Sequence, residues 1–183
     1  MTDKRLFIGS FMPHEALKEL FENAKQNLNN EGRFKWTRTP ENFHITFHFI
    51  GSIPEKDLWK WQDAIQDLIH KDFDLGLQVS GLNFFKKKGR PSVLYAALKP
   101  NQALYELHQD ILNRLYNKGL INEKQDRFTP HITFARIKKT PDDFETKIAQ
   151  INRHFKTFSL PPVSVKLIES VLSPQGALYR SID

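Results

Sequence analysis

Cysteine is absent from the 183 residues of this chain. Its absence excludes disulfide frameworks, thiolate nucleophiles and zinc sites built on cysteine. No apolar run approaches the roughly 18 residues that a membrane-spanning helix requires, and the apolar stretch near the N-terminus is too short for a secretory signal. We therefore expect a cytoplasmic protein without a membrane partner, in which histidines and carboxylates carry any chemistry.

The chain has fewer acidic than basic residues: 21 aspartates and glutamates against 27 lysines and arginines, which gives a formal net charge of +6. The hydrophobic content of 39% is typical of a globular chain, and the length is sufficient to bury a core. Positive charge favours a polyanionic partner, although it also serves solubility alone. Composition therefore predicts one compact domain and leaves nucleic acid binding open.

An internal repeat organises the chain. The tetrapeptide His-Ile-Thr-Phe occurs at residues 44–47 and again at 131–134, an offset of 131 − 44 = 87. At this same offset, residues 13–20 resemble 100–107, and three single residues match three others: Leu28, Gly32 and Pro54 with Leu115, Gly119 and Pro141. The chain is therefore interpreted as a duplicated unit, with copies at roughly 5–85 and 92–172.

Each copy is predicted to run strand, helix, motif strand, helix, strand. The expected first strands are 6–11 and 93–98, and the expected last strands are roughly 75–85 and 163–172. This alternation predicts an α/β (α+β) fold class. We expect a single domain over residues 1–183, bilobal, with two antiparallel-type sheets facing a central cleft and the helices outside.

The motif places two kinds of side chain on opposite faces of a strand, because successive side chains alternate. His44 and Thr46 share one face, while Ile45 and Phe47 take the other. A single histidine on a strand is more often structural than catalytic. The same tetrapeptide kept in both copies favours catalysis, because duplicated core positions usually drift among apolar residues.

The second copy repeats the arrangement, with His131 and Thr133 on one face and Ile132 and Phe134 on the other. Pseudo-symmetry would bring the two polar faces together. A histidine pair suits phosphodiester cleavage, since near neutral pH one ring can be the base and the other the acid. Threonine hydroxyls and a guanidinium would hold the phosphate oxygens, and no metal or cofactor is required.

Arg136 is the nearest guanidinium, although strand alternation sends it to the far face unless a bulge near Ala135 turns it back. His48 shares the face of His44 if the strand continues, and we expect it to line the cleft. The other histidines, at 14, 70, 108 and 154, are predicted at the surface. The basic loop 86–90 is a solvated hairpin tip or a guide for an RNA backbone.

At these residues the chain resembles the 2H phosphoesterase superfamily, which is named for two His-x-Thr/Ser (HxTx) motifs, and within it the RNA 2′,3′-cyclic phosphodiesterases long called 2′-5′ RNA ligases. The similarity spans nearly the whole chain. It lies in Trp36 and in the segments 5–8, 40–47, 49–51, 89–91, 93–95, 127–136, 169–172 and 176–179. His48 departs from the resemblance, because relatives commonly carry lysine there.

The resemblance implies metal-independent hydrolysis of a terminal RNA 2′,3′-cyclic phosphate to a 2′-phosphomonoester. By position, it implies that His44 is the proton donor to the departing 3′-oxygen and His131 the proton acceptor from water. Thr46, Thr133 and Arg136 match phosphate-contacting positions. The expected partners are RNA ends or small cyclic nucleotides, and nothing in the sequence demands more than a monomer.

Two other functions stay open at this point. The same site could cleave linear 2′-5′ linkages or join RNA in the reverse reaction, because one site stabilises the same transition state in both directions. The chain could instead be a non-catalytic module that binds RNA ends. Paired His-x-Thr strands argue against that module, since binding alone needs cations rather than titrating imidazoles.

Overall fold

The computed structural model describes residues 3–29, 32–123, 127–174 and 176–182. Short strands and helices alternate along the chain, as the sequence predicts. The strands are β1 (Asp3–Phe11), β2 (Arg33–Trp36), β3 (His44–Pro54), β4 (Asp72–Phe73), β5 (Gln78–Lys87), β6 (Arg90–Leu98), β7 (His131–Lys139), β8 (Phe158–Ser159), β9 (Val163–Ser164), β10 (Lys166–Ser173) and β11 (Gly176–Ser181). The helices are α1 (Glu15–Leu28), α2 (Leu58–Ile69), α3 (Gln102–Asn117) and α4 (Phe144–His154), with 3₁₀ turns at Pro40–Asn42 and Glu55–Asp57.

Between its two end strands, the main sheet has the same order of equivalent strands in both halves: β10, β1 and β3 in one, and β5, β6 and β7 in the other. Its order is β11-β10-β1-β3-β7-β6-β5-β8, with β2 added on β7, and the pairings are antiparallel. The two motif strands, β3 and β7, are the central neighbours, yet Ile45 with Ile132 is the only residue pair in register between them within the described chain. A second small sheet joins β4 to β9. The predicted α+β fold with antiparallel sheets is confirmed.

Each half of the main sheet takes strands from both sequence copies. The strand β5, from the first copy, pairs with β6 of the second, while β10, from the second copy, pairs with β1 of the first. The helices follow the same exchange, since α2 contacts α3 and α1 contacts α4. The halves of the sheet therefore do not coincide with the halves of the sequence.

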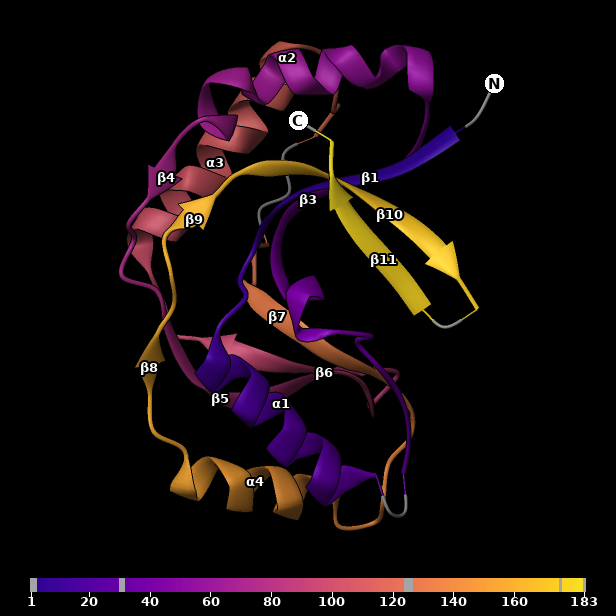
Figure 1. Cartoon of the computed structure of the whole chain (residues 1–183), viewed down its shortest axis with the longest axis vertical. Helices are drawn as coiled ribbons and strands as arrows, with labels where there is room; N and C mark the ends of the chain where they lie inside the picture. Colours follow the sequence, from indigo (N-terminus) through magenta and orange to yellow (C-terminus); the bar gives the residue numbers. More distant parts are fainter. Residues whose placement is uncertain (1–2, 30–31, 124–126, 175, 183) are drawn as a thin grey trace.

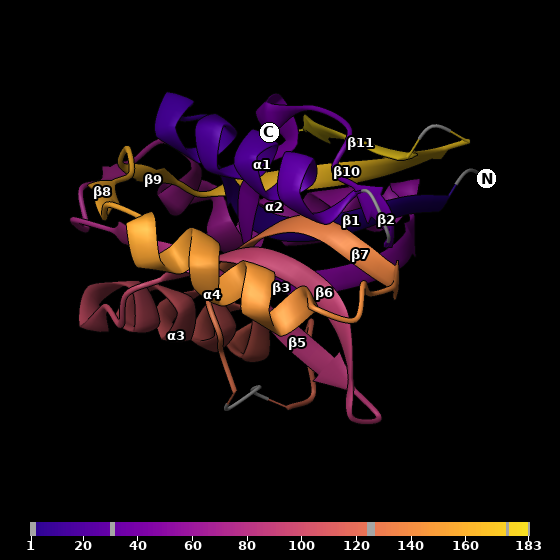
Figure 2. The same cartoon turned by 90° about the horizontal axis from the view of Figure 1, so that it is seen from below.

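The helices lie outside the strands, in two pairs. In Figure 1, α2 and α3 lie together at one end of the molecule, and α1 and α4 lie together at the other. Seen from below, α1 and α4 run side by side over the strands (Figure 2). A continuous cluster of buried side chains fills the space between helices and sheet, and this leaves the opposite face of the central strands for chemistry.

The helices bury the apolar stripes that the sequence predicts. In α1 the buried positions are Leu17, Leu20, Phe21, Ala24 and Leu28. In α3 they include Leu104, Leu107, Ile111 and Leu115. Fully burying one such side chain stabilises the fold by about 1.5–3 kcal/mol. The α3 helix also has a side-chain cap, because the Asn101 oxygen accepts from the Leu104 amide at 2.9 Å.

A β-bulge interrupts each motif strand at the equivalent residue. Opposite β1, Thr46 pairs with Gly9 and His48 with Ile8, so Phe47 is the extra residue. Opposite β6, Thr133 pairs with Tyr95 and Ala135 with Leu94, so Phe134 is the extra residue, 134 − 47 = 87 positions later. A bulge reverses the alternation of the side chains that follow it. The residues beyond each motif therefore change face.

This bulge corrects the prediction that His48 lines the cleft. His48 is buried beneath α2, where its ring stacks on Trp61 with the centroids 6.4 Å apart. The prediction that His108 lies at the surface is also wrong. Its ring, on α3, is 2% exposed and stacks on Phe128 at 3.9 Å. The two histidines interact electrostatically under the bulged strand, on the side away from the motif histidines.

The buried His108 should make the fold sensitive to acid. Burial lowers the pKa of His108 to about 4, although a hydrogen bond to the Phe47 carbonyl opposes the shift and the charge of His48 adds to it. As the pH falls, the His108 ring gains a proton in the unfolded chain at a higher pH than in the folded chain. The contribution of His108 to the free energy of unfolding is therefore fully present above about pH 6.5 and declines toward pH 4, by up to about 3 kcal/mol. His108→Gln should make the measured decline between pH 7 and 5 in urea unfolding smaller, and the part that remains belongs to His44, His48 and His131, whose pKa burial also lowers.

The control for this measurement is His70→Gln, because His70 is exposed at the end of α2. The control should keep the pH dependence of the wild type. An unchanged decline in His108→Gln would mean that His108 is not the group responsible.

The helices in the described ranges include none long and apolar enough to cross a membrane.

Candidate active site

The pairing of β3 with β7 gathers the four polar side chains of the motifs. With Ile45 opposite Ile132, antiparallel geometry sets His44 beside Thr133 and Thr46 beside His131. Ile45 and Ile132 are fully buried on the helix side, so the four polar side chains take the other face. The two motif histidines thus begin neighbouring strands on one face of the sheet, and the charge of His131 acts on His44.

Both imidazoles are held by the same kind of hydrogen bond. Nδ1 of His44 lies 2.6 Å from the carbonyl oxygen of Asn42, and Nδ1 of His131 lies 2.7 Å from that of Thr129. A carbonyl oxygen only accepts, so each Nδ1 carries the hydrogen and donates it. The bond fixes the ring and leaves Nε2 as the atom that exchanges a proton.

Burial favours the neutral form of both rings. Burial lowers the pKa of His44, the hydrogen bond to Asn42 opposes this, and the charge of His131 lowers the pKa further. Burial also lowers the pKa of His131, against the hydrogen bond to Thr129. The effect of one ring on the other reflects their proximity. When one ring is protonated, protonation of the other is disfavoured, as an acid–base pair requires.

Aromatic side chains flank each histidine, and sequence reasoning did not find them. His44 lies between Phe7 and Tyr179, with ring centroids 4.8 and 4.7 Å away. His131 lies against Phe85 and Tyr95, at 4.8 and 5.1 Å. Tyr179 and Phe85 belong to the last strand of the chain and to β5, far from the motifs in sequence. Only the strand order brings them to the site.

The remaining predicted residues also lie on this face. The hydroxyls of Thr46 and Thr133 make no hydrogen bond in the described part of the chain, so both are free to donate to a ligand. Phe134 and Ala135 are both buried, and the exposed Arg136 follows them. The bulge at Phe134 thus turns Arg136 to the face of the motif histidines, as the sequence analysis required for a role at the site. The charge of Arg136 reaches Tyr179, whose pKa it lowers against the dominant effect of burial.

Residues 7–173 match the family model of the AKAP7 2'5' RNA ligase-like domain. The chain belongs to this family. The resemblance to the 2H phosphoesterases is thereby confirmed.

Three similar proteins can be set beside the chain, one by its sequence and two by their structures. The RNA 2',3'-cyclic phosphodiesterase of Thermotoga maritima is 26% identical over 181 residues, which are 96% of this chain and 91% of that protein. The crystal structure of TT0787 of Thermus thermophilus has a TM-score of 0.72 at 23% identity, covering 98% and 95% of the two chains. E. coli LigT complexed with 3'-AMP has a TM-score of 0.68 at 16% identity, covering 100% and 97%. The two structures support the fold.

Among the residues that the structure describes, no group of three or more histidine, cysteine, aspartate or glutamate side chains is arranged to hold a metal ion. The predicted surface positions of His70 and His154 are confirmed, since both are exposed. His14 is half-buried instead, and its ring stacks on Phe158 with centroids 5.1 Å apart. The two motif histidines, by contrast, begin the two central strands, His44 in β3 and His131 in β7.

Proposed function

We propose that this chain hydrolyses the terminal 2′,3′-cyclic phosphodiester of RNA to a 2′-phosphomonoester by acid–base catalysis, without metal or cofactor. His131 is the proton acceptor and His44 the proton donor. The observation that carries the proposal is the pair of imidazoles on adjacent strands, each tied through Nδ1 to a backbone carbonyl. The name of the Thermotoga relative supports the choice of substrate.

The proton transfers follow from the free Nε2 atoms. Neutral His131 takes a proton from water through Nε2 while the water oxygen attacks phosphorus. The bond from phosphorus to the 3′-oxygen breaks, and protonated His44 gives its Nε2 proton to that oxygen. Each transfer is typically worth about 10²–10⁴ in rate. The product is a 2′-phosphomonoester with a free 3′-hydroxyl.

The negative charge of the transition state is assigned to three side chains. Thr46 and Thr133 donate their free hydroxyls to the non-bridging oxygens, one from each motif strand. Arg136 adds a charge-assisted hydrogen bond from the side of β7. One chain supplies all five groups, so the proposal needs only a monomer, built as one domain of two pseudo-symmetric lobes. The same order of strands from both ends supports this organisation.

The proposed function is tested with a short RNA ending in a 2′,3′-cyclic phosphate. We expect turnover that excess EDTA leaves unchanged, since the two imidazoles and the clamp supply the chemistry. The position of the phosphate in the product is read by chromatography against 2′- and 3′-phosphate standards, and only the 2′-phosphate is expected.

Four results would contradict the proposal. Absence of turnover would favour a module that binds RNA ends. Loss of turnover in EDTA with recovery on added divalent metal would replace the acid–base pair with a metal. A 3′-phosphate product would mean that the 2′-oxygen is the leaving group, so that His44 does not protonate the 3′-oxygen as proposed. Cleavage of a linear 2′-5′ linkage faster than the cyclic phosphate, or faster joining of RNA ends, would favour the alternative functions.

A further inference from the structure

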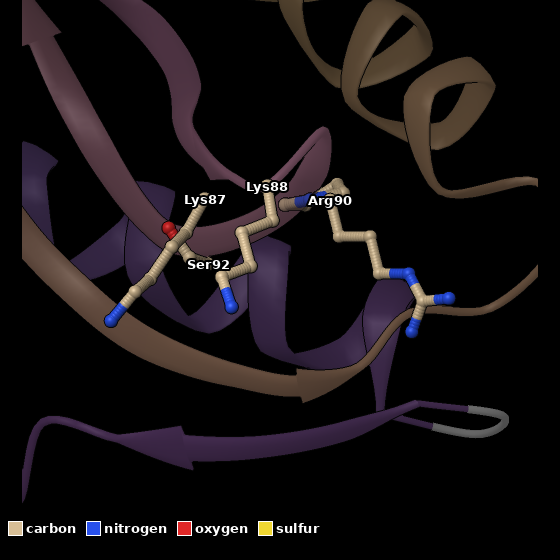
Figure 3. A pocket seen from close by; sticks show the side chains of 5 residues that line it. Lys87, Lys88, Arg90 and Ser92 are labelled. Carbon is tan, nitrogen blue, oxygen red and sulfur yellow. The ribbon is translucent and has the colours of Figure 1, made fainter.

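The hairpin between β5 and β6 carries a basic pocket of about 480 Å³, lined by Lys87, Lys88, Arg90, Pro91 and Ser92. Lys88 and Gly89 form its two-residue turn, and both have positive φ, 52° and 75°. Figure 3 shows the side chains of Lys87 and Lys88 extending to the same side of the hairpin, whereas the Arg90 guanidinium reaches away from them. The positive charges of the hairpin tip are therefore spread over a wide part of its surface.

Within the described ranges, the hairpin cations Lys87, Lys88 and Arg90 have no carboxylate partner, unlike many of the cations on the helices. Carboxylates neutralise Lys60, Arg114, Lys118 and Lys147 elsewhere in the molecule. At the hairpin, only Lys86 has such a partner, Glu145 of α4 at 3.0 Å. In the ranges that the structure describes, no carboxylate pairs with Lys87, Lys88 or Arg90.

The sheet also sets like charges directly opposite one another at this end. The register pairs Lys87 with Arg90, Lys35 with Arg136 and Arg33 with Lys139. Like charges in cross-strand pairs destabilise a sheet. Among the described residues no ion pair joins a carboxylate to these cations. Such a row is the arrangement expected where a polyanion supplies the compensating charge.

The hairpin cations share a face with the motif histidines. Phe85, which contacts His131, is opposite Val93, and Val93 is opposite Arg136 in the next strand. Two residues beyond Phe85, strand alternation returns Lys87 to the same face, because Lys86 between them turns to Glu145 on the helix side. The basic strip therefore runs from Arg136 beside the site to the hairpin tip.

We propose that this strip binds the RNA strand upstream of the reacting end, with the hairpin pocket taking a backbone phosphate. The inference rests on the proposed function. A cyclic phosphate occupies the 3′ terminus, so the strand can continue from the site only on its 5′ side. From Tyr95, opposite Thr133, to Arg90 the β6 backbone runs five residues, which span at most about 17 Å because Ser92 is the extra residue of a bulge. The pocket thus lies beyond the reach of a mononucleotide, and the enzyme prefers an oligonucleotide.

The test variant is K87Q/K88N/R90Q, in which asparagine tolerates the positive φ of residue 88. Its kcat/KM for a six-nucleotide RNA ending in a cyclic phosphate should fall about 10-fold or more. Its kcat/KM for adenosine 2′,3′-cyclic phosphate should not change. The slope of log kcat/KM against log salt for the oligonucleotide should become shallower by about 0.7 for each backbone phosphate that the variant no longer neutralises.

The matched control is K71Q/R153Q/K156Q, which removes the same number of positive charges at exposed positions: one after α2, one in the last turn of α4 and one after α4. The control should keep at least half of the wild-type values. Fluorescence anisotropy with an RNA ending in a 2′-phosphate adds an arm that needs no turnover, and the hairpin variant should bind it about 10-fold more weakly. Failure of the proposed function would stop turnover by the wild type, while this binding arm would still decide the hairpin proposal.

Three outcomes would overturn the inference. The hairpin variant could retain wild-type turnover and binding. The control could lose as much affinity as the hairpin variant, which would reduce the effect to net charge. The cyclic mononucleotide could lose as much kcat/KM as the oligonucleotide, which would mean that the hairpin acts on the reacting phosphate itself.

Discussion

Alanine in place of His44 or His131 should lower kcat/KM for a cyclic-phosphate RNA by about 10²-fold or more, because each substitution would remove one of the two proposed proton transfers. The double variant loses much less than the product of the two single losses, since the rings act as one unit. Both side chains lie on the open face of the sheet, so unfolding stays cooperative with a midpoint near that of the wild type. Turnover and thermal unfolding of the same preparations measure both effects.

His154→Ala is the matched control, since this histidine is exposed at the end of α4. It should retain wild-type turnover. Near-normal hydrolysis by either single variant at the motif positions would refute the acid–base pair.

The pH profile separates the two roles. The proposed mechanism requires protonated His44 and neutral His131, so kcat/KM should be bell-shaped. Burial lowers the pKa of both rings, which puts the optimum on the acid side of pH 6.5. Activity is lost with rising pH as His44 passes its pKa, and with falling pH as His131 gains a proton. In the residual activity, His44→Ala should lack the alkaline limb and His131→Ala the acid limb; the reverse pattern would exchange donor and acceptor.

Arg136→Ala should lower kcat/KM by about 10²-fold, which is the loss typical for one donor to a developing oxyanion. The effect should fall mainly on kcat, because the charge that Arg136 stabilises is largest in the transition state. Arg136→Lys should recover only part of the loss, since an ammonium keeps the charge but not the bidentate geometry of a guanidinium. Steady-state kinetics with the cyclic-phosphate RNA measure both variants.

Lys156→Ala is the control for this series, because it removes an exposed cation that follows α4 and is not one of the like-charge pairs of the sheet. We expect a loss of less than 3-fold, by weaker steering alone. If Arg136→Ala and Lys156→Ala lost the same activity, general charge rather than a bond to the phosphate would explain the role of Arg136. Full recovery by Arg136→Lys would likewise exclude bidentate contact.

The repeated motif made the candidate site accessible from the sequence. Strand alternation alone separated His44 and Thr46 from Ile45 and Phe47, and the structure keeps this division, with both apolar residues buried. Helical periodicity found the buried stripes of α1 and α3 in the same way. Such patterns are local, since they depend on the geometry of a single element.

The bulges mark where local reasoning fails. One extra residue reverses the side-chain alternation, and nothing in the spacing of His48 or Arg136 from the motif signals it. His48 consequently lies under α2, whereas Arg136 reaches the open face. His108 was misplaced for a different reason: its burial depends on Phe128, which comes from a segment that packs against α3 only in the folded chain.

The sequence by itself determined the α+β class, the repeat at an offset of 87 residues and the two polar faces of the motif strands. The alternation of side chains in a strand and their periodicity in a helix depend only on residues that are close together in the sequence. Only the tertiary structure decided that each half of the sheet combines strands from both copies. It also decided that Tyr179 and Phe85 flank the histidines and that like charges line up beside the site. Strand pairing between distant segments depends on their mutual packing, which no single segment encodes.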